Sequence, residues 1–91
     1  MTIEYIKRFV AVAECLNFRK AATVMSVSQP TLSYSISMLE EKLGTTLFMR
    51  NTAFVKLSSA GERFLPVAKE IIELYEKTIN DISKLMDEEA G

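Results

Sequence analysis

The chain has 91 residues, of which 48% are hydrophobic and 25% are charged, and its formal net charge is −1. This length supplies one hydrophobic core of modest size and excludes two independent domains. No apolar run approaches the roughly 18 residues needed to span a bilayer, and no signal-peptide pattern is present, so we expect no membrane association.

The side chains that most enzymes and metal sites require are scarce. Histidine is absent, Cys15 is the only cysteine, and the three glycines form no phosphate-binding loop. We therefore expect no enzyme, no metal site and no cofactor. Cys15 cannot form an internal disulfide, which favours a reducing cytoplasm as the location, and the helical pattern predicts it to be a buried small hydrophobe.

The charges are distributed unevenly along the chain. Residues 1–58 carry seven Lys and Arg against four Glu, a balance of +3. Residues 59–91 carry four basic against eight acidic side chains, a balance of −4. This asymmetry predicts different roles for the two segments.

Two helices are predicted in the first 25 residues. Apolar residues recur at helical spacing over residues 3–16, with Thr2 available as the N-cap. Asn17 ends this helix and can cap a shorter one, residues 18–25. A tight connection then leads to Ser28.

A third helix is predicted between the N-cap Ser28 and Gly44, which suits a left-handed stop. Its apolar stripe, expected to be buried, consists of Leu32, Ile36, Leu39 and Leu43. The opposite side is small, rich in hydroxyl groups and free of charge: Pro30, Thr31, Ser33, Tyr34, Ser37 and Met38.

A helix-turn-helix pattern is formed by the helix of residues 18–25, a connection of about three residues and the helix that begins after Ser28. An uncharged polar face led by Gln29 suits a DNA major groove, because no bulky charge keeps the backbone from the base edges. The alternative interpretation of this face is a loosely packed surface helix.

The next segment changes to strand-like character. Residues 47–49 and 54–57 are predicted strands separated by a turn at residues 50–53, which together would form a small hairpin wing. Arg50 and Lys56 are either contacts to a DNA backbone or solvated hairpin charges.

A long final helix is predicted from about Ala60 to Glu89, opened by a capping box at Ser59 and Glu62. Its polar positions alternate with a heptad stripe, which we expect to form a dimer interface: Leu65, Ala68, Ile72, Tyr75, Ile79, Ile82 and Met86. Alternatively, the first part of the stripe folds back on its own domain. Pro66 either kinks the helix or lies near its start.

Two segments of the chain are typical of one family: FVAVAECLNFRKAATVMSVSQPTLSYSISMLEEKLGTTLFMR and the following LSSAGERFLP. Through them nearly the whole chain resembles the N-terminal DNA-binding domain of LysR-type transcriptional regulators. This resemblance implies a mainly α fold, a winged helix-turn-helix of three helices and a small β-hairpin in residues 1–58, with the motif proper at residues 18–37. Residues 59–91 would be the linker helix, which pairs antiparallel in dimers of this family. The C-terminal effector-binding domain that normally follows would lie outside this chain.

The resemblance also assigns positions. Gln29, Pro30, Thr31 and Ser33 match the start of the recognition helix. Tyr34 stands where the family very often has Arg, and Ser37 and Met38 replace common basic or amide residues. In the wing, Ala53 and Phe54 replace common arginines, which leaves Arg50 as the matching basic position.

The resulting hypothesis is sequence-specific binding of double-stranded DNA by a homodimer. The expected DNA contacts are Gln29, Pro30, Thr31, Ser33, Tyr34, Ser37, Arg19, Lys20 and Arg50. A small-molecule effector would act only through the C-terminal domain, and higher oligomers would require the full-length protein. The alternative is a winged-helix module for protein interaction or dimerisation that binds DNA weakly or not at all, which the acidic total and the missing arginines favour.

Overall fold

The structure is a computed structural model that describes residues 1–90. Four helices and one two-stranded antiparallel sheet follow one another in the order α1 (Ile3–Cys15), α2 (Phe18–Met25), α3 (Gln29–Leu43), β1 (Phe48–Arg50), β2 (Val55–Leu57) and α4 (Ser59–Ala90). This mainly helical architecture with a small hairpin confirms the predicted fold class.

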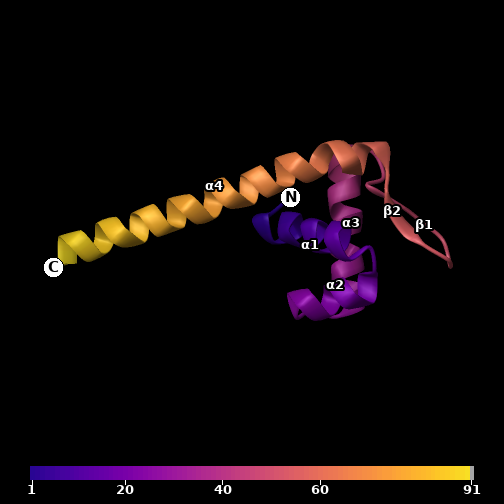
Figure 1. Cartoon of the computed structure of the whole chain (residues 1–91), viewed down its shortest axis with the longest axis horizontal. Coiled ribbons are helices and arrows are strands. Elements are labelled where there is room, and N and C mark those ends of the chain that lie inside the picture. Colours follow the sequence, from indigo (N-terminus) through magenta and orange to yellow (C-terminus); the bar gives the residue numbers. More distant parts are fainter. Residues whose placement is uncertain (91) are drawn as a thin grey trace.

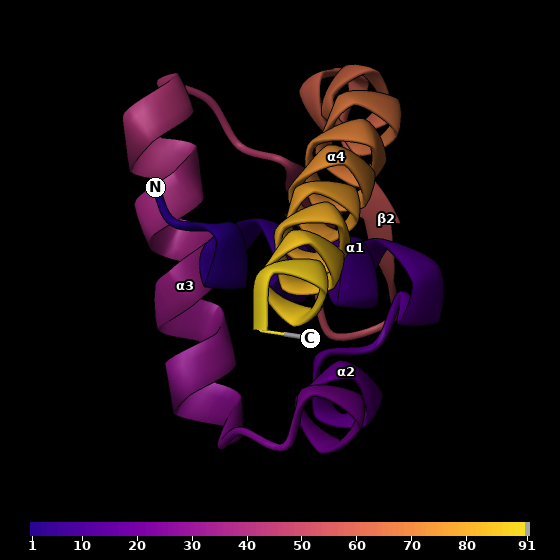
Figure 2. The ribbon, with the colours of Figure 1, turned by 90° about the vertical axis from the view of Figure 1, so that its left-hand side faces the viewer.

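The molecule is elongated, with extents of 56 × 25 × 19 Å, because α4 projects far beyond the rest of the chain (Figure 1). Helix α1 and strand β2 contact α4, while α2 and α3 pack against α1 and against each other. Viewed along α4, α3 stands on the left, α2 lies at the bottom, and α1 runs across the middle (Figure 2). The C-terminal half of α4 therefore extends away from the domain.

The helix boundaries follow from local hydrogen bonding. The side chains of Thr2, Asn17 and Ser28 accept hydrogen bonds from backbone N–H groups three residues further on, as predicted for N-caps. Helix α3 ends at Gly44, whose φ of 73° lies in the left-handed region that glycine adopts most readily.

Aromatic rings from distant parts of the sequence form the centre of the core. The ring of Phe9 on α1 lies 5.4 Å from that of Phe48 on β1 and 5.0 Å from that of Phe64 on α4. Phe18 on α2 meets Phe48 edge-on at 6.0 Å. These contacts join four elements and fix the wing and the start of α4 on the helical body.

The wing is attached at its base by polar contacts. Glu40 on α3 accepts a hydrogen bond from the backbone N–H of Leu47, at 2.7 Å. The backbone N–H of Ser58 donates to the Leu47 carbonyl, and the Ser58 hydroxyl donates to the Thr46 carbonyl. The end of α3, both strands and the start of α4 are thus tied together at one junction.

Three local predictions are wrong at the level of single residues. The cap of α4 is Ser58, whose hydroxyl oxygen accepts from the N–H of Gly61, so Ser59 belongs to the first turn and the predicted capping box does not form. Leu43 is 40% exposed, because the last turn of α3 extends past the core. Cys15 is half-buried rather than buried.

The hairpin is shifted by one residue from the prediction. Arg50 belongs to β1 and pairs with Val55, while the turn comprises residues 51–54. Asn51 causes this shift: its side-chain oxygen accepts hydrogen bonds from the N–H groups of Ala53 and Phe54, which closes the turn.

The predicted stripe of α4 divides into two parts. Ala68 is completely buried in its own domain, so its assignment to a dimer interface is wrong. Leu65 and Ile72 are partly buried and pack against the same core. The stripe is exposed only beyond them, at Tyr75, Ile79, Ile82 and Met86. Helix α4 runs through Pro66 without interruption.

No helix within residues 1–90 combines the length and the apolar character that crossing a membrane would require.

Gly61 provides a test of the junction. An added Cβ would overlap the carbonyl oxygen of Leu47 and lie 2.8 Å from Cδ2 of Leu57. We expect Gly61→Ala to lower the free energy of unfolding by about 2–3 kcal/mol, measured by urea denaturation.

Gly44→Ala is the matched control, because a Cβ at Gly44 meets nothing within 4 Å. It should cost only the left-handed backbone strain of about 1–2 kcal/mol. It should also leave the NMR amide signals of Leu47 and Ser58 in place, whereas Gly61→Ala should displace them. Unchanged signals of these two amides in Gly61→Ala would contradict the described junction.

Candidate nucleic-acid interface

Helix α3 has the two faces that its sequence predicts. Leu32, Ile36 and Leu39 are completely buried, and the opposite side is open to solvent. Tyr34 is 57% exposed. Pro30, Thr31 and Ser37 are also exposed, and Ser33 is partly exposed. The uncharged side is therefore accessible and is not packed against the interior.

A groove of about 610 Å³ borders this face, between the start of α2, the start of α3 and the wing. It brings together four of the predicted site residues: Arg19, Gln29, Ser33 and Arg50. The other lining residues come from the connection before α2 and from the wing: Leu16, Asn17, Phe18, Asn51, Thr52, Ala53, Phe54 and Val55. No acidic side chain lines the groove in the part of the chain that the structure describes.

Arg50 is held within the groove by an aromatic ring. The central carbon of its guanidinium lies 4.6 Å from the centre of the Phe18 ring. Stacking on a ring face lets an arginine keep its N–H donors free while its position is restricted. The guanidinium is therefore available to an anion that enters the groove.

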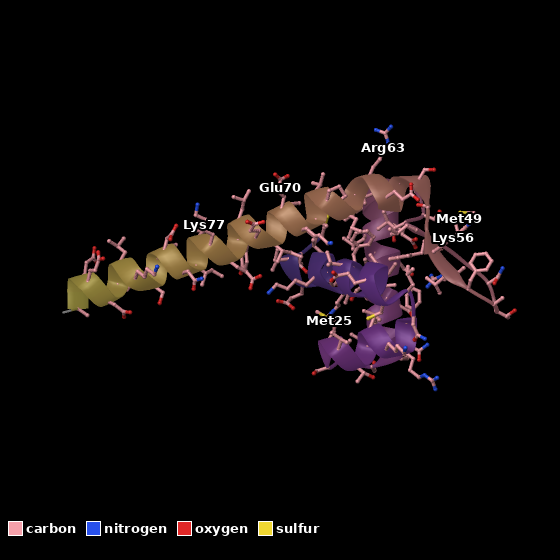
Figure 3. The ribbon with its side chains drawn as sticks, viewed as in Figure 1. Met25, Met49, Lys56, Arg63, Glu70 and Lys77 are labelled. Atoms are coloured by element: carbon pink, nitrogen blue, oxygen red, sulfur yellow. The ribbon has the colours of Figure 1, made fainter. Side chains whose placement is uncertain are left out.

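A second cation lies further along the wing. Lys56 has its ammonium nitrogen 5.5 Å from the centre of the Phe54 ring. Figure 3 shows Lys56 and Met49 on the wing, at the end of the molecule opposite the C-terminal half of α4. The basic side chains of the wing and the acidic segment of α4 are therefore well separated.

The structure places the remaining predicted residues outside the groove. Pro30, Thr31, Tyr34 and Ser37 lie on the exposed side of α3, and Lys20 is exposed in the first turn of α2. The site thus consists of an uncharged helix face and a neighbouring groove that contains two arginines.

Sequence reasoning missed three polar groove residues, Asn17, Asn51 and Thr52. Asn17 was predicted only as a cap, and its side chain does cap α2 through the Lys20 N–H. Asn51 was predicted only as part of a turn. A hairpin that folds back beside the helix pair is the signal that could have identified Asn51 and Thr52.

The start of α3 is ordered by Ser28. Its hydroxyl oxygen accepts from the N–H of Thr31 at 3.2 Å and donates to the Thr31 hydroxyl at 2.8 Å. Pro30 occupies the first turn, where its missing N–H has little cost. These local contacts fix the backbone next to Gln29.

Two short helices joined by a tight connection, with a hairpin beside the second, define the class of winged helix-turn-helix proteins. The model of the family "Bacterial regulatory helix-turn-helix protein, lysR family" matches residues 3–62. The chain belongs to this LysR family.

Curated relatives are transcriptional regulators. The chain is 43% identical over 79 residues to the HTH-type transcriptional regulator BudR of Klebsiella aerogenes, which covers 87% of this chain and 55% of BudR. It is 48% identical over 71 residues to a probable hydrogen peroxide-inducible genes activator of Streptomyces viridosporus, covering 78% of this chain and 23% of the relative. The chain thus spans only part of the length of these proteins.

Solved structures with the same fold include complexes with DNA. The CbnR_DBD–DNA complex is 36% identical, with a TM-score of 0.87, and the match covers 96% of this chain and 99% of that one. Vibrio fischeri DarR in complex with DNA is 29% identical, with a TM-score of 0.90, and the match covers 96% of this chain and 30% of that one.

The contribution of the Ser28 cap can be measured directly. Ser28→Ala should lower the free energy of unfolding by about 1 kcal/mol, because the Thr31 N–H loses its acceptor at a helix start. Thermal denaturation gives this value.

Ser28→Asn is the control, since asparagine caps helices about as well as serine, and it should retain nearly the full stability. Equal losses for the two variants would contradict the role of Ser28 as a hydrogen-bonding cap.

Proposed function

We propose that the chain binds double-stranded DNA in a sequence-specific manner, with α3 in the major groove and the wing along the backbone. The observation that carries this proposal is the exposed, uncharged face of α3 beside a groove with Arg19 and Arg50. Small polar side chains let a helix approach base edges closely, and flanking cations attract phosphates. The DNA complexes of CbnR_DBD and DarR support it, because this chain shares their fold.

Gln29 is the proposed base-reading residue. It is exposed at the first position of α3, and its amide can pair bidentately with adenine. Ser33 and Tyr34 offer hydroxyls to bases or phosphates. Arg19, Lys20 and Arg50 supply backbone attraction, and so few cations predict a shallow dependence of affinity on salt.

The chain would form a homodimer through α4. The outer part of the predicted stripe is exposed on α4: Tyr75, Ile79, Ile82 and Met86. Further exposed apolar residues form a neighbouring row, which shares Ile82, on the side that the domain leaves free: Val67, Ile71, Leu74, Ile82 and Leu85. At 100° per residue this row lies roughly 100° around the helix from Ala68 and Ile72, which contact the domain. The polar side chains of Glu70 and Lys77 point away from the domain in Figure 3. A second copy is the natural occupant, because such a row is otherwise exposed to water over several turns.

An antiparallel arrangement fits this row best. A two-fold axis near Glu76 would bring Val67 opposite Leu85 of the second copy and Ile71 close to its Ile82, so that one surface complements itself. The same register would place Arg63 beside the acidic end of the partner helix, residues 87–89. Opposite charges at these ends favour the antiparallel orientation over the parallel one.

The remaining expectations concern the whole protein. We propose that the whole protein is cytoplasmic, carries a C-terminal effector-binding domain and forms higher oligomers. These proposals rest on membership of the LysR family and not on the residues described here. The alternative, an interaction module without DNA binding, predicts that in vitro selection from a random duplex library recovers no preferred sequence.

Gln29→Ala should weaken binding to the duplex recovered by selection by about 1–3 kcal/mol and relax preference at one base position. Binding to a scrambled duplex should change little. Fluorescence anisotropy at several salt concentrations measures both. Equal losses on the two duplexes would contradict base reading by Gln29.

Arg50→Ala should weaken binding to both duplexes and lower the slope of log affinity against log salt by about one per subunit, as expected for a lost phosphate contact. Lys77→Ala is the control, because Lys77 lies on α4, away from the groove, and points away from the domain (Figure 3). An unchanged salt slope in Arg50→Ala would argue against contact with the backbone.

Leu74→Glu should convert the dimer to a monomer, because Leu74 is 62% exposed and lies in the middle of the apolar row. Analytical ultracentrifugation measures the change. Met49→Glu adds the same charge at an exposed position of the wing and should leave the dimer intact. A dimer that persists in Leu74→Glu would exclude this face as the interface.

A further inference from the structure

A partly buried chain of two hydrogen bonds connects α1 to the first half of α3. The guanidinium Nη1 of Arg8 donates to the hydroxyl oxygen of Ser35 at 2.8 Å. The Ser35 hydroxyl in turn donates to the backbone carbonyl of Thr31 at 3.0 Å. Ser35 is completely buried, so both partners of its hydroxyl come from the protein.

This arrangement is expensive for a domain with a small core. Within residues 1–90 the only ion pair joins Lys69 to Glu14, so no carboxylate compensates the charge of Arg8. Its Nε is buried without a hydrogen-bond partner, and its guanidinium carbon lies 5.9 Å from the centre of the Tyr5 ring. Arg8 is only half-buried, so part of its charge stays solvated, but its buried Nε without a partner has a desolvation cost that a hydrophobic side chain would avoid. Stability alone therefore does not account for an arginine here.

The two hydrogen bonds of Arg8 and Ser35 lie close to the proposed interface. At 100° per residue, Thr31 and Ser35 lie on one flank of α3, while Gln29 and Ser33 lie on the flank that borders the wing groove. Arg8 therefore fixes α3 on the side that the wing does not contact. The fixed segment is the part of α3 whose exposed side chains would face base edges.

We propose that Arg8 is a positioning residue, which sets the orientation of the first half of α3 through Ser35 and the Thr31 carbonyl. This inference rests on the proposed function for its consequence, the discrimination between DNA sequences. Arg8 itself does not contact DNA in this account. Its effect on binding arises because base reading requires side chains held within a fraction of an ångström.

The first test needs no DNA. Arg8→Met keeps an unbranched stem as far as the position of Nε and removes the guanidinium donor, and Ser35→Ala removes the hydroxyl. Each variant should accelerate hydrogen exchange of the amides of residues 32–36 about tenfold, while those of residues 39–43 stay within about twofold of the wild type. Arg8→Lys should restore part of the protection. Uniform acceleration, or none, would overturn the positioning role.

The second test uses the duplex recovered by in vitro selection and a scrambled duplex. In Arg8→Met, affinity for the selected duplex should fall about tenfold, with the salt slope and the affinity for scrambled DNA unchanged. Combining Arg8→Met with Ser35→Ala should add little to either single loss, because both break the same chain.

The outcomes separate the two proposals. A smaller salt slope in Arg8→Met would mean direct contact with phosphate and would overturn positioning. Full additivity of the two changes would do the same. If the wild type selects no duplex, the proposed function fails, and hydrogen exchange still decides whether Arg8 orients α3.

Discussion

The complete burial of Leu32, Ile36 and Leu39 is the constraint on which the rest of this structure depends. Because these side chains share one side of α3, their burial fixes which residues the helix exposes. As far as Ser37 the exposed residues of α3 are uncharged, whereas an ordinary solvated helix would carry Lys and Glu there; Glu41 and Lys42 are exposed only near its end. The groove beside α3 then adds two arginines at the edge of this face. The spacing of the apolar residues in α3 thus determines both which side chains pack into the core and which uncharged side chains face solvent.

In helix α4 the apolar residues again determine which side packs on the domain, but here part of the apolar surface stays exposed. Its apolar arc is wider than one domain can cover, so Ala68 and Ile72 pack inward while Leu74 and Leu85 remain exposed. At 32 residues and 1.5 Å per residue the helix is about 48 Å long, which is well beyond the helical body. The domain holds only the first part of α4 through the junction at Ser58 and Gly61. The remainder carries the exposed apolar side chains that the proposed dimer would bury.

Local features of the fold were predictable from the sequence, and features that depend on distant contacts were not. Caps at Thr2, Asn17 and Ser28 and the stop at Gly44 require only neighbouring residues. The α4 cap moved to Ser58 because its hydroxyl also bonds to Thr46 across the wing base. The complete burial of Ala68 depends on how α4 lies on α1, and the Arg8–Ser35 bond spans 27 positions. Of the candidate site, the α3 face and Arg50 were predictable, whereas Asn51 and Thr52 enter only once the hairpin folds back.

The central claim, that the uncharged side of α3 together with the wing groove meets DNA, is tested most directly by NMR titration of the chain with its selected duplex. The account predicts that the largest amide shift changes occur at residues 28–37 and 50–54, with small changes along the outer side of α4. Changes concentrated on α4 or on the first turns of α1, with residues 28–37 unaffected, would contradict it.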